Sequence, residues 1–160
     1  MEKPFIESYG ISIVCMPKTV MAFGSFDIIH PGHMFYLQKA KALGDRLIVV
    51  IARDRSIELM KGRKPVFLER DRLKIVGSLG FVDKAVLGNR ISDPAGRMKI
   101  IKEYRPDVIA LGYNQSANVR QLRAWLRKNG INARVVRIKA RLNPARYKSS
   151  VARRILSKGI

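Results

Sequence analysis

Five short apolar segments alternate along the chain with segments that carry the helical spacing of apolar residues. The expected strands are 20–23, 47–52, 82–87, 108–111 and 133–138. The expected helices are 34–43, a short helix after residue 54, 69–79, 93–104, 118–130 and a final helix from about residue 149. Because parallel strands need a crossover connection, usually a helix, this alternation predicts an α/β fold. We expect a doubly wound, five-stranded parallel sheet with helices on both faces.

Residues that favour helix ends support these boundaries. Asp93-Pro94 and Asn118 are typical of helix starts, and Gly130 is typical of a helix end. Residues 1–18 precede the first expected strand and are predicted to be an N-terminal extension, a candidate oligomer contact. The predicted folded domain is then 19–160.

The composition is that of one globular domain. The 160 residues are 47% hydrophobic, enough to bury a core. No apolar run approaches the roughly 18 to 20 residues of a membrane span, and the first residues lack the order of a signal peptide. The predicted location is the cytoplasm, with no membrane partner. Cys15 is the only cysteine, which excludes an internal disulfide and a thiolate metal cluster.

Positive charge is the unusual global feature. The chain has 32 lysines and arginines against 12 acidic residues, a net charge of +20. The last acidic residue is Asp107, so the segment 108–160 carries basic residues and no acid. Such a chain favours polyanionic partners, namely nucleotides, acidic metabolites, nucleic acid or anionic lipid. Charge alone does not choose among them.

Both histidines of the chain lie in one glycine-containing turn. It reads Gly24-Ser25-Phe26-Asp27-Ile28-Ile29-His30-Pro31-Gly32-His33 and joins the first expected strand to the first expected helix. Pro31 fits the first turn of a helix, and Gly24 and Gly32 allow a ligand to approach the backbone closely. A helix N-terminus supplies backbone donors and positive potential, so this histidine turn predicts an anion site.

The histidine pair is more informative than either residue alone. An isolated histidine is more often a packed or exposed side chain than a functional one. His30 and His33 lie three residues apart at a strand-to-helix turn, a spacing that lets both point to the same place. Two ligands without a nearby cysteine or glutamate do not complete a zinc site, so no protein metal site is predicted. Stabilising charge on a phosphoryl group fits the pair better.

Other polar segments are expected at the same edge of the sheet. Arg53-Asp54 follows the second expected strand, 112–115 follows the fourth, and Ser149-Ser150 begins the last expected helix. In open α/β sheets, ligands bind at the carboxyl ends of the strands. We therefore expect these segments to surround the ligand of the histidine turn.

The histidine turn resembles the G-[TS]-F-D-x-x-H-x-G-H signature of the cytidylyltransferase-like nucleotidyltransferases. The resemblance extends from about residue 20 to 115 and includes Glu69-Arg70. Gly62-Arg63-Lys64-Pro65, taken with Ala110-Leu111-Gly112-Tyr113-Asn114-Gln115, is most similar to the archaeal-type FAD synthases. The next most similar family is glycerol-3-phosphate cytidylyltransferase. The resemblance implies a Rossmann-like fold.

The same resemblance implies a nucleotidyltransferase in which an acceptor phosphate attacks the α-phosphate of a nucleoside triphosphate and pyrophosphate leaves. The implied substrates are ATP and FMN, and the alternative pair is CTP with glycerol 3-phosphate or a related polyol phosphate. His30 and His33 would contact the triphosphate, and Lys61 and Lys64 would bind phosphate, unless these lysines are only surface charge. The implied cofactor is Mg²⁺, held mainly through the triphosphate and water.

Further site residues follow from the resemblance. Asp27 and Arg72 are expected on the acceptor side, although Arg70 is adjacent to Arg72 and equally basic. Ser149 and Ser150 are expected at the β- and γ-phosphates, or else only cap the last helix. The remaining nucleotide-binding residues are Gly24, Ser25, Phe26, Gly32, Gly112, Tyr113, Asn114 and Gln115, with Tyr113 stacking on the base and Gln115 hydrogen bonding to it.

Two departures from the resembled family leave the substrate open. Archaeal-type FAD synthases usually have an aspartate where this chain has Asn114, and they commonly carry cysteines in the C-terminal half, where this chain has none. A basic nucleic-acid-binding module is the alternative from another class; it explains the charge but not the histidine turn. Incidental RNA binding by the acid-free C-terminal third and a homodimer are further predicted associations.

Overall fold

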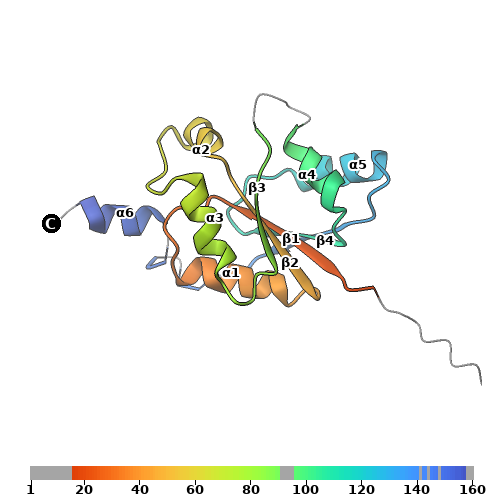
Figure 1. The fold of residues 1–160 in the computed structure, drawn as a ribbon, viewed down its shortest axis with the longest axis horizontal. Helices are drawn as coiled ribbons and strands as arrows, with labels where there is room; N and C mark the ends of the chain where they lie inside the picture. Colours follow the sequence, from red (N-terminus) through yellow and green to blue (C-terminus); the bar gives the residue numbers. More distant parts are fainter. Residues whose placement is uncertain (1–15, 91–95, 141, 144, 148, 158–160) are drawn as a thin grey trace, which may run out of the picture.

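The computed structural model describes residues 16–90, 96–140, 142–143, 145–147 and 149–157. Its strands are β1 (Thr19–Gly24), β2 (Arg46–Ile51), β3 (Lys84–Leu87), β4 (Val108–Gly112) and β5 (Arg134–Ile138). Its helices are α1 (Pro31–Lys41), α2 (Asp54–Lys61), α3 (Glu69–Gly77), α4 (Gly96–Tyr104), α5 (Val119–Lys128) and α6 (Ser149–Ser157). The five strands form one parallel sheet in the order β3-β2-β1-β4-β5, which confirms the predicted α/β fold (Figure 1).

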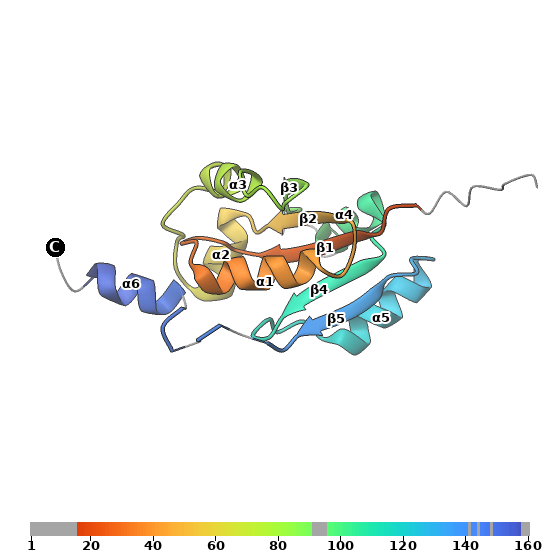
Figure 2. The same ribbon diagram turned by 90° about the horizontal axis from the view of Figure 1, so that it is seen from below.

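Side chains from successive strand positions pack on opposite faces of the sheet. In β1, Val20 and Ala22 belong to the core shared with α1 and α3, whereas Met21 belongs to the core shared with α4 and α5. In β2, all of Leu47–Ile51 are buried, as expected for an inner strand covered on both faces. The helices therefore form two layers with the sheet between them (Figure 2).

Several predicted helix and strand ends are close to the observed ones. The Asn118 side chain accepts a hydrogen bond from the Gln121 amide at 3.1 Å, so the predicted cap of α5 is confirmed. α1 ends at Lys41, two residues before the predicted end, and β3 begins at Lys84, two residues after its predicted start. Residue 93, the predicted start of α4, lies outside the described residues.

The remaining differences concern α3 and α6. α3 ends at Gly77, two residues before the predicted end, because the Leu79 amide bonds to the Val76 carbonyl three residues back, at 3.2 Å, and no longer to the carbonyl four residues back. α6 begins at Ser149, so both predicted serines lie in its first turn. The residue before α6 is not described, and the predicted cap there stays a prediction.

The winding direction of the sheet reverses at β1. β2 and β3 lie on one side of it, and β4 and β5 lie on the other. Ligands of doubly wound folds bind where the carboxyl ends of such strands separate. α6 stands beyond this carboxyl edge, apart from both helical layers (Figures 1 and 2). None of the helices in the described ranges is long and apolar enough to cross a membrane.

Gly44 lies in the tight connection between α1 and β2. A Cβ at Gly44 would lie 2.7 Å from the Lys18 carbonyl oxygen and 2.8 Å from Val20 Cγ2, inside van der Waals contact. We expect Gly44→Ala to lower the free energy of unfolding by about 1–3 kcal/mol, measured by urea denaturation. Gly80→Ala is the control, because a Cβ there meets nothing within 4 Å. An equal loss in both variants would contradict the steric explanation.

Candidate active site

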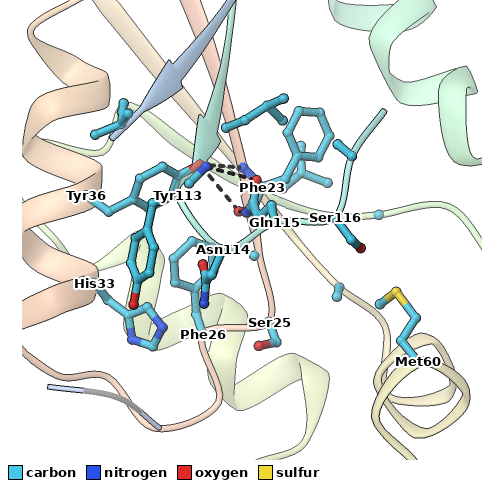
Figure 3. Close-up of a pocket in the computed structure, with 18 of the residues that line it drawn as sticks. Phe23, Ser25, Phe26, His33, Tyr36, Met60, Tyr113, Asn114, Gln115 and Ser116 are labelled. Carbon is cyan, nitrogen blue, oxygen red and sulfur yellow. Dashed lines mark hydrogen bonds between the residues drawn. The ribbon is translucent and has the colours of Figure 1, made fainter. Parts of the chain in front are cut away.

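A cavity of about 980 Å³ opens at the carboxyl edge of the sheet. Its lining residues come from the ends of β1, β2 and β4, from the starts of α1 and α5 and from α2 and α4. Figure 3 shows several of these side chains. The predicted site residues that line the cavity are Gly24, Ser25, Phe26, His30, Gly32, His33, Lys61, Gly112, Tyr113, Asn114, Gln115 and Ser150. Among the described residues, no aspartate or glutamate lines the cavity, and neither do Lys64 and Arg72. The side chain of Ser149 is not described.

The histidine turn brings the two imidazoles into contact. His30 is the N-cap of α1 and His33 lies in the first turn. Their rings stack with centroids 3.8 Å apart and planes 21° apart, so the predicted convergence is confirmed. The Phe26 ring meets His33 edge to face, with centroids 5.3 Å apart. A stacked pair at a helix N-terminus is suited to an anion that bridges both rings.

Phe26 holds the turn in a rare backbone conformation. Its φ is 47°, in the left-handed region that costs a bulky residue free energy. The side chain is buried, which keeps the residue in place. A Cβ at Gly24 would lie 2.6 Å from the Phe26 ring, so glycine is required there for the ring to fold back over β1.

Both histidines are less basic than a free imidazole. The pKa of His33 is lowered to about 3, first by burial and then by the positive charges of His30 and Lys61, while the Ile28 carbonyl opposes the shift. Burial also lowers the pKa of His30. At neutral pH both rings are therefore neutral and each carries a single N–H; for His33 an oxyanion would compete with the Ile28 carbonyl for that N–H.

Asp27 joins three segments at the phosphate side of the histidine turn. Its Oδ1 accepts hydrogen bonds from the amides of Val66 at 2.7 Å and Phe67 at 3.1 Å. Its Oδ2 pairs with Arg153 of α6 and lies 3.9 Å from Nη1 of Arg63. The carboxylate is buried and engaged by these groups, so in this structure Asp27 organises the site, and its predicted contact with the acceptor stays a prediction.

Arg72 is likewise internal. It has no exposed surface, and its guanidinium donates to the carbonyls of Phe67, Ser25 and Ala52 and to Oδ1 of Asp54. These bonds leave the side chain no face toward the cavity. In this structure Arg72 braces the loops around the site, and its predicted direct contact with the acceptor stays a prediction.

The starts of α2 and α3 are tied to each other. The Asp54 amide donates to Oε2 of Glu69 at 3.0 Å, and the Glu69 amide donates to Oδ2 of Asp54 at 3.2 Å. Arg53 adds a bond to Oε1 of Glu69 at 2.8 Å. Each carboxylate thus satisfies a free N–H at the other helix's first turn. This reciprocal pair fixes the direction of α2 and hence the place of its last residue, Lys61.

Lys61, the last residue of α2, and Arg63, in the loop that follows it, both line the cavity, as does Arg53 after β2. Lys61 Nζ donates to Ser25 Oγ at 2.8 Å, and burial followed by the charge of Arg63 lowers the Lys61 pKa. Gly62, with φ 64°, reverses the chain between them. Lys64 does not line the cavity, so Arg63 takes the position predicted for it.

Gln115 is used inside the chain. The Gly112 amide donates to its Oε1 at 3.1 Å, and its Nε2 donates to the Phe23 carbonyl. Gln115 therefore clips the end of β4 to the end of β1, and the predicted hydrogen bond from this side chain to a base would require breaking both contacts. The neighbouring Asn114 is exposed in the cavity and points toward the histidine turn (Figure 3).

Two further side chains hold this edge together and were not predicted. The Tyr36 hydroxyl on α1 donates to the Ala110 carbonyl at 2.9 Å, and Arg137 on β5 donates to the Gly112 carbonyl at 2.9 Å. Their partners lie 74 and 25 residues away in the sequence, so no local pattern marks either residue.

The described residues of the cavity would accommodate Mg²⁺ through a bound triphosphate and not through protein carboxylates. Within the described ranges, no group of three histidine, cysteine, aspartate or glutamate side chains could hold a metal. The charged groups lining the cavity are cationic, and the other polar groups are neutral. Mg²⁺ commonly keeps several waters and binds substrate phosphates, so it would be held by triphosphate oxygens here.

The lowered pKa of His33 makes stability depend on pH. Below pH 6.5 His33 becomes protonated in the unfolded chain, whereas in the folded chain it stays neutral until about pH 3. The contribution of His33 to stability is therefore full above pH 6.5 and is lost as the pH falls toward 3. At pH 4.5 this loss amounts to about 2–3 kcal/mol. We expect His33→Gln to remove that part of the pH 7 to pH 4.5 decrease, measured by urea unfolding. The same decrease in both proteins would contradict the assignment.

Comparison with known proteins agrees with this geometry. The family model described as cytidylyltransferase-like matches residues 21–155. A curated FAD synthase from Archaeoglobus profundus is 48% identical over 122 residues, covering 76% of this chain and 75% of that protein. Another, from Thermococcus sibiricus, is 42% identical over 136 residues and covers 84% and 85%.

A solved structure shares both fold and sequence. The protein from Thermoplasma volcanium described as a lipopolysaccharide core biosynthesis protein superposes with a TM-score of 0.73 at 41% identity. The match covers 79% of this chain and 99% of that one. The family model covers most of the chain and the curated relatives are 42–48% identical to it, so the chain belongs to the cytidylyltransferase-like family.

Proposed function

We propose that this protein is an FAD synthase, which transfers AMP from ATP to FMN and releases pyrophosphate. Curated relatives at 42–48% identity over most of the chain carry that name. For this chain, the residues that line the cavity support the proposal. One end is cationic with no lining acid among the described residues, and the walls beyond it are apolar.

The apolar wall favours a flavin over a polyol. Its members come from the ends of β1 and β2 and from α2 and α4, and include Phe23, Val50, Met60, Met98 and Ile100. Met60 is 59% exposed, although methionine is usually buried. An isoalloxazine ring would cover this surface, and a thioether packs well on aromatic rings. Glycerol phosphate has no surface that needs such a wall.

The proposed reaction is an in-line displacement. A phosphate oxygen of FMN forms a bond to the α-phosphorus of ATP, and the bond from that phosphorus to the bridging oxygen breaks, with its electron pair leaving on pyrophosphate. Because the attacking phosphate is already ionised, no general base is needed. The protein's task is to align two anions and neutralise charge on the transferring group.

We assign the charge-stabilising roles to the histidine turn and the cations facing it. Neutral His30 and His33 would donate N–H groups to the triphosphate at the start of α1. Lys61 and Arg63 would balance the charge of the two phosphates. Ser150, in the first turn of α6, supports binding of the terminal phosphates through a helix N-terminus. Mg²⁺ bound to the triphosphate would supply further charge neutralisation.

Assays with each of the two candidate pairs of substrates test the proposed reaction. Purified protein with Mg²⁺ should form FAD and pyrophosphate from FMN and ATP, while CTP with glycerol 3-phosphate should give no product. His33→Ala should lose at least 100-fold in kcat with its unfolding transition retained, because one oxyanion donor is removed. A CDP-polyol product without FAD would refute the proposal.

The same assay tests the apolar wall. Met60→Ala should raise the KM for FMN several-fold and leave the KM for ATP unchanged, because only the flavin would cover that side chain. Leu59→Ala is a matched control on the same helix, since Leu59 is similarly exposed but does not line the cavity. Equal KM values for FMN in the two variants would contradict the placement of the flavin against this wall.

We also propose incidental RNA binding, supported by charge. α5 exposes Arg120, Arg127 and Lys128 and contains no acidic residue. RNA affinity should be micromolar at low salt and fall steeply between 50 and 300 mM salt, in a fluorescence-anisotropy titration. The double variant Arg120→Gln, Arg127→Gln should weaken it without changing FAD formation. Absence of binding at 50 mM salt would end this proposal.

We also propose a homodimer and a cytoplasmic location. A homodimer would cover exposed apolar side chains such as Val66, Phe67 and Leu68, and sedimentation at several concentrations decides it. A cytoplasmic location is proposed because ATP and FMN are cytoplasmic substrates, and cell fractionation tests it.

A further inference from the structure

One guanidinium fixes the shape of the segment that follows β4. Arg137 Nη1 donates to the carbonyls of Gly112 at 2.9 Å and Gln115 at 2.8 Å, and its Nη2 donates to the carbonyl of Ala117 at 3.0 Å. We call residues 112–118 the β4 loop. Three of its carbonyls therefore converge on a single side chain from the neighbouring strand.

The position of Arg137 sets which way these peptide groups face. All residues of the β4 loop line the cavity, but Arg137 does not. The guanidinium thus lies behind the loop. In a trans peptide the N–H points opposite to the C=O of the same plane. The carbonyls of Gln115 and Ala117 turn toward Arg137, so the N–H groups of Ser116 and Asn118 turn away from it, toward the cavity.

These two N–H groups are available to a ligand. In the described part of the chain, neither the backbone N–H of Ser116 nor that of Asn118 donates a hydrogen bond. Asn118 is also the N-cap of α5, where the helix end concentrates donors. The loop therefore presents a row of hydrogen-bond donors, which matches ring nitrogens and carbonyl oxygens of a nucleobase.

Different side chains fix the two ends of the β4 loop, and Arg137 fixes the far end. The Gln115 side chain ties its start to β1, and the Gln115 amide bonds to the Gly112 carbonyl at 3.3 Å. Beyond Gln115, Arg137 ties the loop to β5 through its hydrogen bond to the Ala117 carbonyl. Removal of Arg137 would free the peptide groups that carry the Ser116 and Asn118 donors.

We propose that Arg137 is a positioning residue for the nucleobase of the donor nucleotide, acting through the Ser116 and Asn118 amides of the β4 loop. The proposal rests on the proposed function for the identity of that nucleotide as ATP. It assigns Arg137 to nucleotide affinity and leaves the phosphoryl chemistry to the histidine turn.

Arg137→Met and Arg137→Lys test this assignment. Methionine keeps the stem and removes all three hydrogen bonds, while the lysine ammonium lacks the fork that reaches several carbonyls. Arg105→Met is the matched control, because Arg105 also donates to a backbone carbonyl, that of Gly130 at 2.8 Å, and does not line the cavity. For each variant we would measure ATP and FMN binding by calorimetry, kcat and KM, and the unfolding midpoint.

Arg137→Met should raise the Kd and KM for ATP at least tenfold, with kcat at saturating ATP within about threefold of the parent and unchanged FMN affinity. Arg137→Lys should be intermediate, and Arg105→Met should bind ATP normally. An unchanged Kd for ATP in Arg137→Met overturns the proposal, as does an equal loss of ATP and FMN affinity. If Arg137→Met does not fold, Arg137→Lys decides by the same criteria.

Failure of the proposed function has a different signature. Unaltered protein that bound CTP and not ATP, or formed no FAD, would refute the FAD synthase assignment. Arg137 would then be tested with CTP, and a tenfold loss of CTP affinity would still support the positioning role.

Discussion

The buried carboxylate of Asp27 is the interaction on which the phosphate end of the cavity depends. Burial alone would raise its pKa, but hydrogen bonds from Phe67, Arg153 and Val66 outweigh that effect, and the pKa is lowered. The group is therefore ionised at neutral pH. A single negative charge thereby holds the histidine turn, the loop before α3, and α6, and through these contacts it sets the positions of Arg63 and Arg153.

This carboxylate does not neutralise the positive charge that surrounds it. Lys61, Arg63 and Arg153 lie close enough to one another that Arg63 and Arg153 lower the Lys61 pKa, against the attraction of Asp27. Like charges held together cost free energy in the ligand-free protein. Binding of the two phosphates of the proposed substrates would remove that repulsion, so part of the free-energy cost of building the site would return as affinity. The arrangement suits a reaction whose main obstacle is the approach of one anion to another.

The parts of the site that the sequence could predict are those encoded by local pattern. Strand and helix periodicity located the sheet, Asn118 marked a helix start, and the spacing of His30 and His33 predicted their convergence. The internal partners of Asp27 and Arg72 could not be predicted in this way. Each was expected to face a ligand because it is charged and lies near the motif, whereas its actual partners, such as Arg153 for Asp27, lie up to 126 residues away. Burial of a charge by distant partners leaves no trace in the local sequence.

Asn114 affects how the site could bind a divalent metal ion. The resemblance leads one to expect an aspartate at this position, where the side chain faces the histidine turn (Figure 3). With Asn114 the described lining of the cavity holds no carboxylate, so its positive potential is not reduced from within. A neutral amide still offers an oxygen to a hydrated cation and an N–H₂ to a phosphate, but it does not bind a free divalent ion strongly. The proposed Mg²⁺ would therefore be held by the triphosphate and water, and the cavity's own positive charge would meet the negative charge that remains on that complex.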